Sequence, residues 1–246
     1  FFEGGEPFLY YDIMLAGIKY AKRLGLSVGI VTNGYWARTK EKALKYLKPL
    51  QEQGIASIGL SDDAFHYGDL QDTPPKIAHV ICEDLGISNS YYCIEPPNIE
   101  MDHSQNPKGK PIVGGGTVFK GRAVDKLSDG LPFRNWKEFA TCPHEDIDKP
   151  ERVHIDPFGN VFICQGISLG NVNQQSLSDM FRTYQPEKHP ILGPLQKGGP
   201  ALLAENFQFD LSPEYIEPCH LCYVVRKHLL SRFKDYLIPP QVYGES

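Results

Sequence analysis

Four of the six cysteines have a spacing suited to metal chemistry: Cys142, Cys164, Cys219 and Cys222. Cys219 and Cys222 form a Cys-x-x-Cys pair at the start of a segment with helical apolar periodicity, so we expect both sulfurs to point the same way. Free N–H groups at the start of a helix favour the thiolate, which is the form of cysteine that binds metals. Four such residues suffice for a tetrahedral zinc ion or for an iron–sulfur cluster.

Other uses of these cysteines remain open. A zinc ribbon usually has two Cys-x-x-Cys knuckles, whereas this sequence has one. Disulfide pairing would allow three connectivities, but nothing marks the chain as exported, so metal ligation is the favoured reading. A redox role is less favoured because the pair does not follow a first strand.

The remaining cysteines and the histidines are expected to have structural roles. Cys82 and Cys93 lie in apolar segments and are expected to fill the core. Five histidines show no paired spacing and are expected at the surface or as helix caps: His66, His103, His144, His189 and His220.

A second set of polar residues follows strand-like segments. These residues are Gly4-Gly5-Glu6, Thr32-Asn33-Gly34, Ser61-Asp62-Asp63 and Glu95-Pro96. In parallel α/β folds the carboxyl ends of the strands form the ligand-binding rim. Each group alone is more typical of a turn or a helix cap than of a binding site, and Asp63 in particular is expected to cap the next helix. Four groups at corresponding positions favour a binding site.

The elements that would position these residues alternate between strand and helix. We expect strands at 26–32, 55–61 and 88–95. We expect helices at 8–24, 39–53 and 74–85. Strand starts recur roughly every thirty residues, which is the length of a βα unit and predicts a parallel sheet. Within 8–24 one face carries an apolar stripe made of Leu9, Ile13, Ala16, Tyr20 and Leu24.

The second half of the chain has a looser pattern. Residues 96–140 are loop-like, and the run Gly114–Gly116 lacks the Lys-Ser/Thr of a phosphate-binding loop, so we expect a flexible connection there. Residues 152–164 alternate around an Asp-Pro-Phe-Gly turn and predict a β-hairpin. An amphipathic helix is expected at about 220–237, and a long loop at about 183–217.

Composition narrows the functional classes. The chain has 246 residues, 41% hydrophobic and 22% charged, with a net charge of −5. It therefore offers no basic footprint for nucleic acid and no polybasic segment for an anionic membrane surface. No apolar run is long enough to span a bilayer. We expect a cytoplasmic protein with neither nucleic-acid nor membrane partners.

Taken in order, these motifs resemble the radical S-adenosylmethionine (SAM) enzymes that carry a C-terminal SPASM/twitch domain. The resemblance rests on GGEP, TNG, GLSDDAFH and FKGRAV, followed by Cys142, the hairpin Gly-x4-Cys ending at Cys164, and Cys219-x-x-Cys222. It implies an α/β fold in which residues 1–138 form a partial (β/α)6 TIM-like barrel of parallel strands, missing its first βα unit. Residues 139–246 would form a small α+β cysteine-rich domain containing the hairpin.

The resemblance also implies roles for individual residues. Gly4, Gly5 and Glu6 would line the methionine amino group of SAM, and Asn33 and Ser61 would lie on the same rim. The four cysteines Cys142, Cys164, Cys219 and Cys222 would ligate one auxiliary [4Fe-4S] cluster. No cysteine follows the Cys-x-x-Cys pair, so the match is to the shorter, single-cluster twitch form.

One departure from the family concerns catalysis. The Cys-x3-Cys-x2-Cys triad that holds the SAM-cleaving cluster does not occur in these residues. We expect this triad, and with it a second [4Fe-4S] cluster, in a missing N-terminal segment. The full-length enzyme would then cleave SAM reductively and abstract hydrogen from a peptide or a small molecule, with flavodoxin or ferredoxin as electron donor. The present fragment alone would be inactive.

Two alternatives stay open. The first is a binding or regulatory protein that keeps the fold but never cleaves SAM. The second is a zinc-stabilised α/β protein that acts on another ligand.

Overall fold

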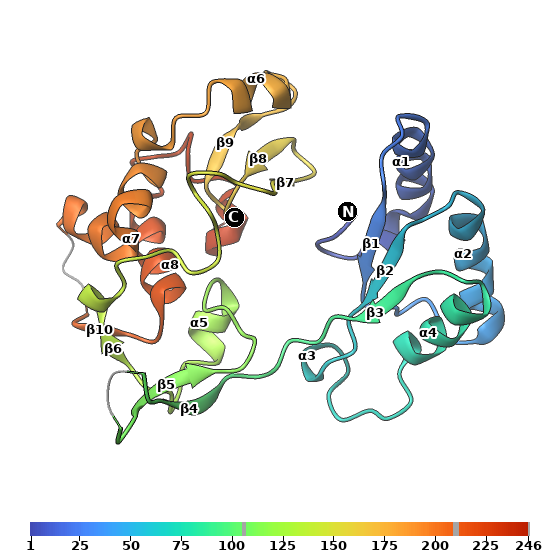
Figure 1. The fold of residues 1–246 in the computed structure, drawn as a ribbon, viewed down its shortest axis with the longest axis horizontal. Helices are drawn as coiled ribbons and strands as arrows, with labels where there is room; N and C mark the ends of the chain where they lie inside the picture. Colours follow the sequence, from blue (N-terminus) through green and yellow to red (C-terminus); the bar gives the residue numbers. More distant parts are fainter. Residues whose placement is uncertain (105–106, 209–211, 246) are drawn as a thin grey trace. The chain divides into compact units, whose positions relative to one another are not determined.

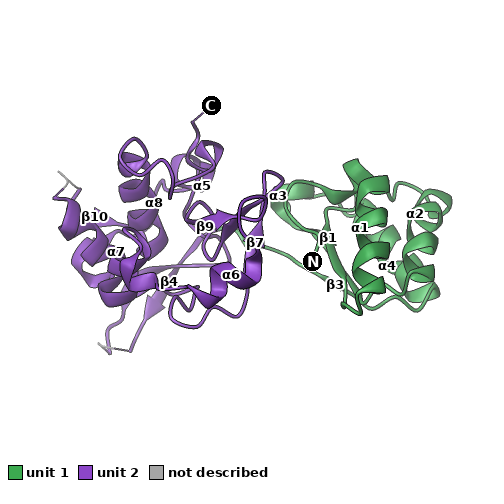
Figure 2. Ribbon diagram, turned by 90° about the horizontal axis from the view of Figure 1, so that it is seen from above, with its two compact units in different colours: residues 1–96 green, residues 97–246 purple. Residues whose placement is uncertain are grey.

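A computed structural model describes residues 1–104, 107–208 and 212–245. The chain divides after Pro96 into two units, Phe1–Pro96 and Pro97–Ser246 (Figure 2). The expected domain boundary after residue 138 falls inside the second unit, and it stays a prediction. Both units mix helices and strands, and the first contains the parallel sheet expected from the sequence.

The sheet of the first unit has three parallel strands in the order β1 (Gly29–Thr32), β2 (Ser57–Leu60) and β3 (Asn89–Tyr91). The three expected strands are thus confirmed, each shorter than its apolar segment. Phe2 extends the sheet beyond β1 by a parallel bridge to Ile30, in which its N–H donates to the Gly29 carbonyl and its own carbonyl accepts from Val31. A closed barrel is not formed by the described residues.

The main helices of the first unit lie on one face of the sheet (Figure 1). The helical elements are η1 (Pro7–Tyr10, a 3-10 helix), α1 (Tyr11–Arg23), α2 (Lys40–Glu52), α3 (Ala64–Tyr67) and α4 (Pro74–Asp84). Ile30, Ile58 and Leu60 point into the core beneath these helices. On the other face, Gly29 and Gly59 have no side chains, and the rings of Phe1 and Tyr92 pack directly on their backbone. A Cβ at either glycine would come within 2.4 Å of the ring.

The orientation of α1 differs from the expected one. The helix buries Met14 and Ile18 against the sheet, together with Phe8 of η1. The apolar stripe of Leu9, Ile13, Ala16, Tyr20 and Leu24 is instead exposed, with Ile13 at 72%. Both rows of residues have helical spacing, so periodicity alone locates the helix but does not decide which row contacts the sheet.

The second unit consists of short strands and two long helices. Its strands are β4 (Asn98–Asp102), β5 (Lys110–Gly114), β6 (Arg134–Asn135), β7 (His154–Ile155), β8 (Asn160–Phe162), β9 (Ser168–Asn171) and β10 (Glu214–Tyr215). Its helices are α5 (Arg122–Lys126), η2 (Trp136–Glu138), α6 (Leu177–Arg182), η3 (Pro186–Lys188), α7 (Leu192–Phe207), α8 (Pro218–Leu229) and η4 (Pro240–Tyr243). All strand pairs are antiparallel, in the orders β4-β5, β10-β6 and β7-β8-β9.

The predicted hairpin at 152–164 is confirmed as β7 and β8, and β9 adds a third strand. Residues 96–140 are more ordered than expected, because β4 and β5 pair there and Gly114 ends β5 instead of starting a flexible connection. Residues 105–106 of that segment, and 209–211 of the expected loop at 183–217, lie outside the described ranges.

The expected loop at 183–217 is wrong for most of its length, because it contains α7. The helix is kinked at Gly198 and Gly199, which have non-helical backbone angles, and Pro200 follows. Gly199 has a φ of +61°, and a Cβ there would lie 2.4 Å from the backbone nitrogen of Thr141. The close approach requires glycine. Gly199 and Pro200, which suggested a loop, thus allow α7 to pack closely against the segment just before Cys142.

Helix α8 begins and ends earlier than expected, at Pro218 and Leu229. Its buried face includes Leu221, Val225 and Leu229, and it packs with α7 in the core of the second unit. Pro218 is the first helical residue, where the missing N–H costs nothing. Cys219 and Cys222 therefore lie in the first turn of a buried helix. In the described ranges, no helix is both long and apolar enough to cross a bilayer.

Candidate metal centre and strand-end loops

The structure places the four predicted ligand cysteines around one cavity in the second unit. Cys142 precedes β7, Cys164 follows β8, and Cys219 and Cys222 start α8; all four are free thiols lining a cavity of about 190 Å³. The hairpin turn is held by Asp156, whose carboxylate accepts from the backbone N–H groups of Phe158 and Asn160 at 2.9 Å. This turn fixes the register of β8 and so delivers Cys164 to the cavity wall.

The separation of the sulfurs bears on what the cavity can hold. Four thiolates on one zinc ion lie about 3.8 Å apart, because each Zn–S bond is about 2.3 Å long. In the described part of the chain, no three of the four cysteines have sulfurs that all lie within 4.8 Å of one another. The void between them is also several times the roughly 30 Å³ that one water occupies in the liquid. The four sulfurs are therefore not gathered around the position of a single ion.

Burial favours the protonated thiol at Cys142, Cys219 and Cys222 in the absence of a cation. It raises the pKa of Cys142 and of Cys219, and it raises the pKa of Cys222 to about 11. The expected stabilisation of thiolates by the start of α8 is therefore outweighed by the loss of solvent. A metal or cluster would have to displace these protons on binding.

A buried arginine lies beside the cysteines. Arg226, only 2% exposed, donates to the carbonyls of Gln165 (3.0 Å) and Cys222 (3.4 Å) and to the hydroxyl of Tyr243 (3.1 Å). Burial alone lowers its pKa, but the neighbouring Cys222 and Tyr243 would favour the guanidinium charge once ionised, and the pKa is raised overall. The side chain is thus a fixed cation next to four potential thiolates. Sequence reasoning missed it, and the only available signal was its position four residues after Cys222 on the same helix.

Two further potential ligands meet Cys219. A donor atom of His144, one of Glu217 and the sulfur of Cys219 all lie within 4.8 Å of one another. Glu217 is half-buried and precedes α8, and its Oε1 accepts from the Phe119 N–H at 2.7 Å. Burial raises the pKa of Glu217. His144 is exposed as expected, but sequence reasoning gave it no role beside a carboxylate that lies far away in the chain.

Two other histidines of this unit have structural roles. Nδ1 of His189 accepts from the N–H groups of Ile191 and Leu192 at 3.1 Å and so caps the start of α7, as expected. His220 was expected at the surface or as a helix cap, and it lies instead inside α8 with its ring buried. It is buried, its Nδ1 accepts from the Ile216 N–H at 3.3 Å, and burial lowers its pKa to about 4.

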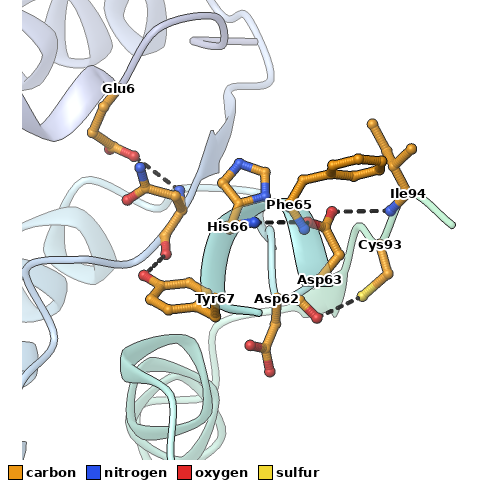
Figure 3. A network of polar contacts seen from close by, with 9 residues as sticks. Glu6, Asp62, Asp63, Phe65, His66, Tyr67, Cys93 and Ile94 are labelled. Carbon is orange, nitrogen blue, oxygen red and sulfur yellow. Dashed lines mark hydrogen bonds and ion pairs between the residues drawn. The ribbon is translucent and has the colours of Figure 1, made fainter. Parts of the chain in front are cut away.

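In the first unit, Glu6 holds two strand-end loops together (Figure 3). Its Oε1 accepts from the Thr32 hydroxyl at 2.7 Å and from the Phe8 N–H at 3.0 Å, and its Oε2 accepts from the Asn33 N–H at 2.8 Å. Ionised carboxylates offer about four acceptor positions, so one remains on Oε2. Gly4 and Gly5 precede it with φ of +81° and +53° and with no atom near their missing side chains. The backbone at this loop is open to a ligand.

Hydrogen bonds also connect the loops after β1 and β2. The side-chain Oδ1 of Asn33 accepts from the Tyr35 N–H at 3.0 Å. The backbone carbonyl of Asn33 accepts from the hydroxyl of Tyr67 in α3. The backbone N–H of Ser61 donates to the Thr32 carbonyl at 2.9 Å. The predicted SAM-contacting residues of the first unit therefore do lie on neighbouring strand ends.

Asp63 is confirmed as a helix cap. One oxygen accepts from the N–H groups of Phe65 and His66 at the start of α3 and lies 2.8 Å from the His66 ring, and the other accepts from the Ile94 N–H at 3.0 Å. Burial raises its pKa, but the hydrogen bonds from Ile94 and His66 outweigh that effect, so the pKa is lowered overall. Cys93, expected in the core, is exposed and donates to the Asp62 carbonyl at 3.2 Å, whereas Cys82 is buried as expected.

Comparison of the chain with protein-family models and with curated proteins gave no match.

Proposed function

We propose that this chain is part of a radical SAM enzyme in which Cys142, Cys164, Cys219 and Cys222 ligate one auxiliary [4Fe-4S] cluster. The observation that carries the proposal is the cavity of about 190 Å³ that all four cysteines line. These cysteines come from three separate segments of the chain; Cys222 is buried and the other three are half-buried, and four cysteines on one cavity are the ligand set that a [4Fe-4S] cluster uses.

The donor set favours iron–sulfur over a four-cysteine zinc site. A cubane cluster places one iron under each thiolate, so the sulfurs are held farther apart than around a single ion. In the described part of the second unit no three of the four sulfurs lie within 4.8 Å of one another, which favours a larger group over a single ion in this proposal. Arg226 adds a positive charge that offsets the charge of the thiolates once their protons are displaced.

The first unit supports the SAM-binding part of the proposal. A doubly wound sheet has helices on both faces, whereas here they cover one face and the other carries glycines (Figure 1). One-sided coverage is what a sector of a (β/α)6 barrel has, because its inner face turns to the barrel interior. Gly4, Gly5, Glu6, Asn33 and Ser61 would form the SAM rim at the strand ends.

In this proposal the residues position the cofactor. The free acceptor position on Glu6 suits the amino group of SAM, and the open backbone at Gly4 and Gly5 leaves room for its carboxylate. When bound, SAM and a reduced cluster supply the 5′-deoxyadenosyl radical that abstracts hydrogen from substrate, for which a peptide or protein is the favoured class. That reaction also needs a Cys-x3-Cys-x2-Cys triad, which these 246 residues do not contain.

Anaerobic reconstitution of the chain with iron and sulfide tests the cluster. We expect a brown protein with about four irons per chain. Cys164→Ala and Cys219→Ala should lose the iron and the colour, while Cys82→Ala and Cys93→Ala, which change cysteines outside the cavity, should retain both. A wild-type protein that is first freed of zinc and still stays colourless and takes up no iron would rule the cluster out.

The enzymatic part of the proposal has a separate test. The coding sequence upstream of Phe1 should encode the triad in frame. A gene that starts at Phe1, or one without the triad, would refute SAM cleavage and leave the cluster assignment standing.

A further inference from the structure

A donor set of different chemistry adjoins the cysteine cavity, which His144 and Cys219 line. His144 offers an imidazole nitrogen, Glu217 a carboxylate oxygen and Cys219 a thiolate sulfur, all within 4.8 Å of one another. In the described part of the chain this is the one set of three or more such side chains with so close a spacing. Ligands around one zinc ion lie about 3.3–3.8 Å apart, so a shift of roughly one ångström would bring the three onto a single ion.

The surroundings allow that shift. His144 is exposed, so its ring can turn without displacing core residues. Glu217 accepts from the backbone N–H groups of Phe119 and Cys219, and because a carboxylate has about four acceptor positions, two remain for a ligand.

We propose that His144, Glu217 and Cys219 bind a single Zn²⁺ ion when the protein lacks its iron–sulfur cluster. Mixed nitrogen, oxygen and sulfur donors suit zinc, and three protein ligands leave the fourth tetrahedral position to water. Cys219 is also one of the cavity cysteines. Zinc and the cluster would therefore exclude each other; this exclusion rests on the function proposed above, whereas the zinc site does not.

Titration of the reduced, cluster-free chain with zinc chloride against a chromophoric chelator tests the site. We expect one tight Zn²⁺ per chain, with affinity at least tenfold lower in His144→Ala and in Glu217→Gln. Both variants should fold, because His144 is exposed and glutamine keeps the oxygen that accepts from Phe119. Cys142→Ala should bind zinc like the wild type, since Cys142 lies outside the three-residue set. Zinc X-ray absorption should show one sulfur neighbour.

Two results would overturn the proposal. Zinc affinity that falls in Cys142→Ala and not in His144→Ala would place the ion among the four cysteines instead. Absence of tight zinc binding to the wild type would remove the site altogether.

The exclusion has its own readout. Zinc added before iron and sulfide should block cluster formation in the wild type and much less in His144→Ala, which keeps all four cysteines. Equal blocking in both proteins would contradict a shared Cys219. Failure of the wild type to form a cluster without zinc would count against the proposed function, and the zinc affinities would still decide the three-residue site.

Discussion

At the residue scale, Glu6 shows how one side chain serves structure and remains available to a ligand. Its carboxylate accepts from Phe8, Thr32 and Asn33, and Thr32 in turn accepts from the indole N–H of Trp36 at 3.1 Å. The resemblance to radical SAM enzymes predicts contact with a cofactor amine, and nothing in the sequence predicts the intramolecular bonds. The carboxylate fixes two strand ends before any ligand binds, so the proposed rim is preorganised.

Replacing Glu6 by glutamine should loosen that rim. One amide oxygen cannot replace a carboxylate that accepts on both sides, and its NH2 group would face the Asn33 N–H. Hydrogen bonds to charged groups contribute about 1.5–3 kcal/mol each, so we expect the unfolding free energy of the first unit to fall by about 1–3 kcal/mol. Urea unfolding followed by Trp36 fluorescence, with Trp136 changed to Phe, measures it.

The matched control is Glu52→Gln, which removes a carboxylate from an exposed position at the end of α2. It should change stability by no more than about 0.5 kcal/mol. If both variants unfold at the same urea concentration, the hydrogen bonds of Glu6 contribute nothing to the fold.

At the element scale, local patterns located most segments and failed where tertiary contacts decide. Strand runs, the hairpin turn and the Cys-x-x-Cys helix are encoded by neighbouring residues, and all three are present. The sequence does not decide which of the two apolar rows of α1 packs against the sheet, because both rows have helical spacing. Helix α7 was not predicted, because Gly199 and Pro200 are typical of a loop. In the structure the kink at these residues lets the backbone of Thr141 pack closely against the helix.

The candidate site divides in the same way. Cysteines at motif spacing could be predicted as a group, because their residue type and the Gly-x4-Cys hairpin are visible in the sequence. His144, Glu217 and Arg226 could not, since folding alone brings His144 to Glu217 and Arg226 to Gln165, and closeness of Glu217 and Arg226 to the Cys-x-x-Cys pair in the sequence does not define a role.

The short helix α3 should respond to acid through its cap. Because hydrogen bonds lower the pKa of Asp63 in the fold, its contribution is complete above the unfolded value of about 3.9 and is lost as the pH falls through the folded value. Once the pH drops below about 4, we expect the urea concentration at the unfolding midpoint of the first unit to decrease. The decrease should be smaller in Asp63→Asn, which keeps a capping oxygen without the charge.

The comparison between wild type and Asp63→Asn isolates this residue, because all other carboxyl groups titrate in both proteins. Trp36 fluorescence during urea unfolding at several pH values between 7 and 3 provides the measurement. Parallel curves for the two proteins would show that Asp63 carries no acid sensitivity.

At the scale of the whole molecule, the two units should depend differently on metal. Cys142, Cys164 and the Cys219–Cys222 pair all lie in the second unit, and a ligand that binds only the folded state stabilises that state. Removing the cluster with a chelator should therefore raise amide hydrogen exchange in β7, β8, β9 and α8. Strands β1, β2 and β3 should keep their protection.

Two variants serve as opposite controls for this experiment. Cys164→Ala should mimic chelation, whereas Cys82→Ala removes a buried thiol from the first unit and should affect exchange there alone. Equal loss of protection in both units after chelation would mean that the metal centre stabilises the chain as one cooperative body.

The origin of the four cysteines in three separate segments also has a kinetic consequence. The cavity exists only after the hairpin, the kinked α7 and the start of α8 have come together, so no part of the second unit can present all four sulfurs alone. During refolding with iron and sulfide in excess, the brown colour should appear no faster than these elements dock. The rate of cluster formation would then report the last folding step of the second unit.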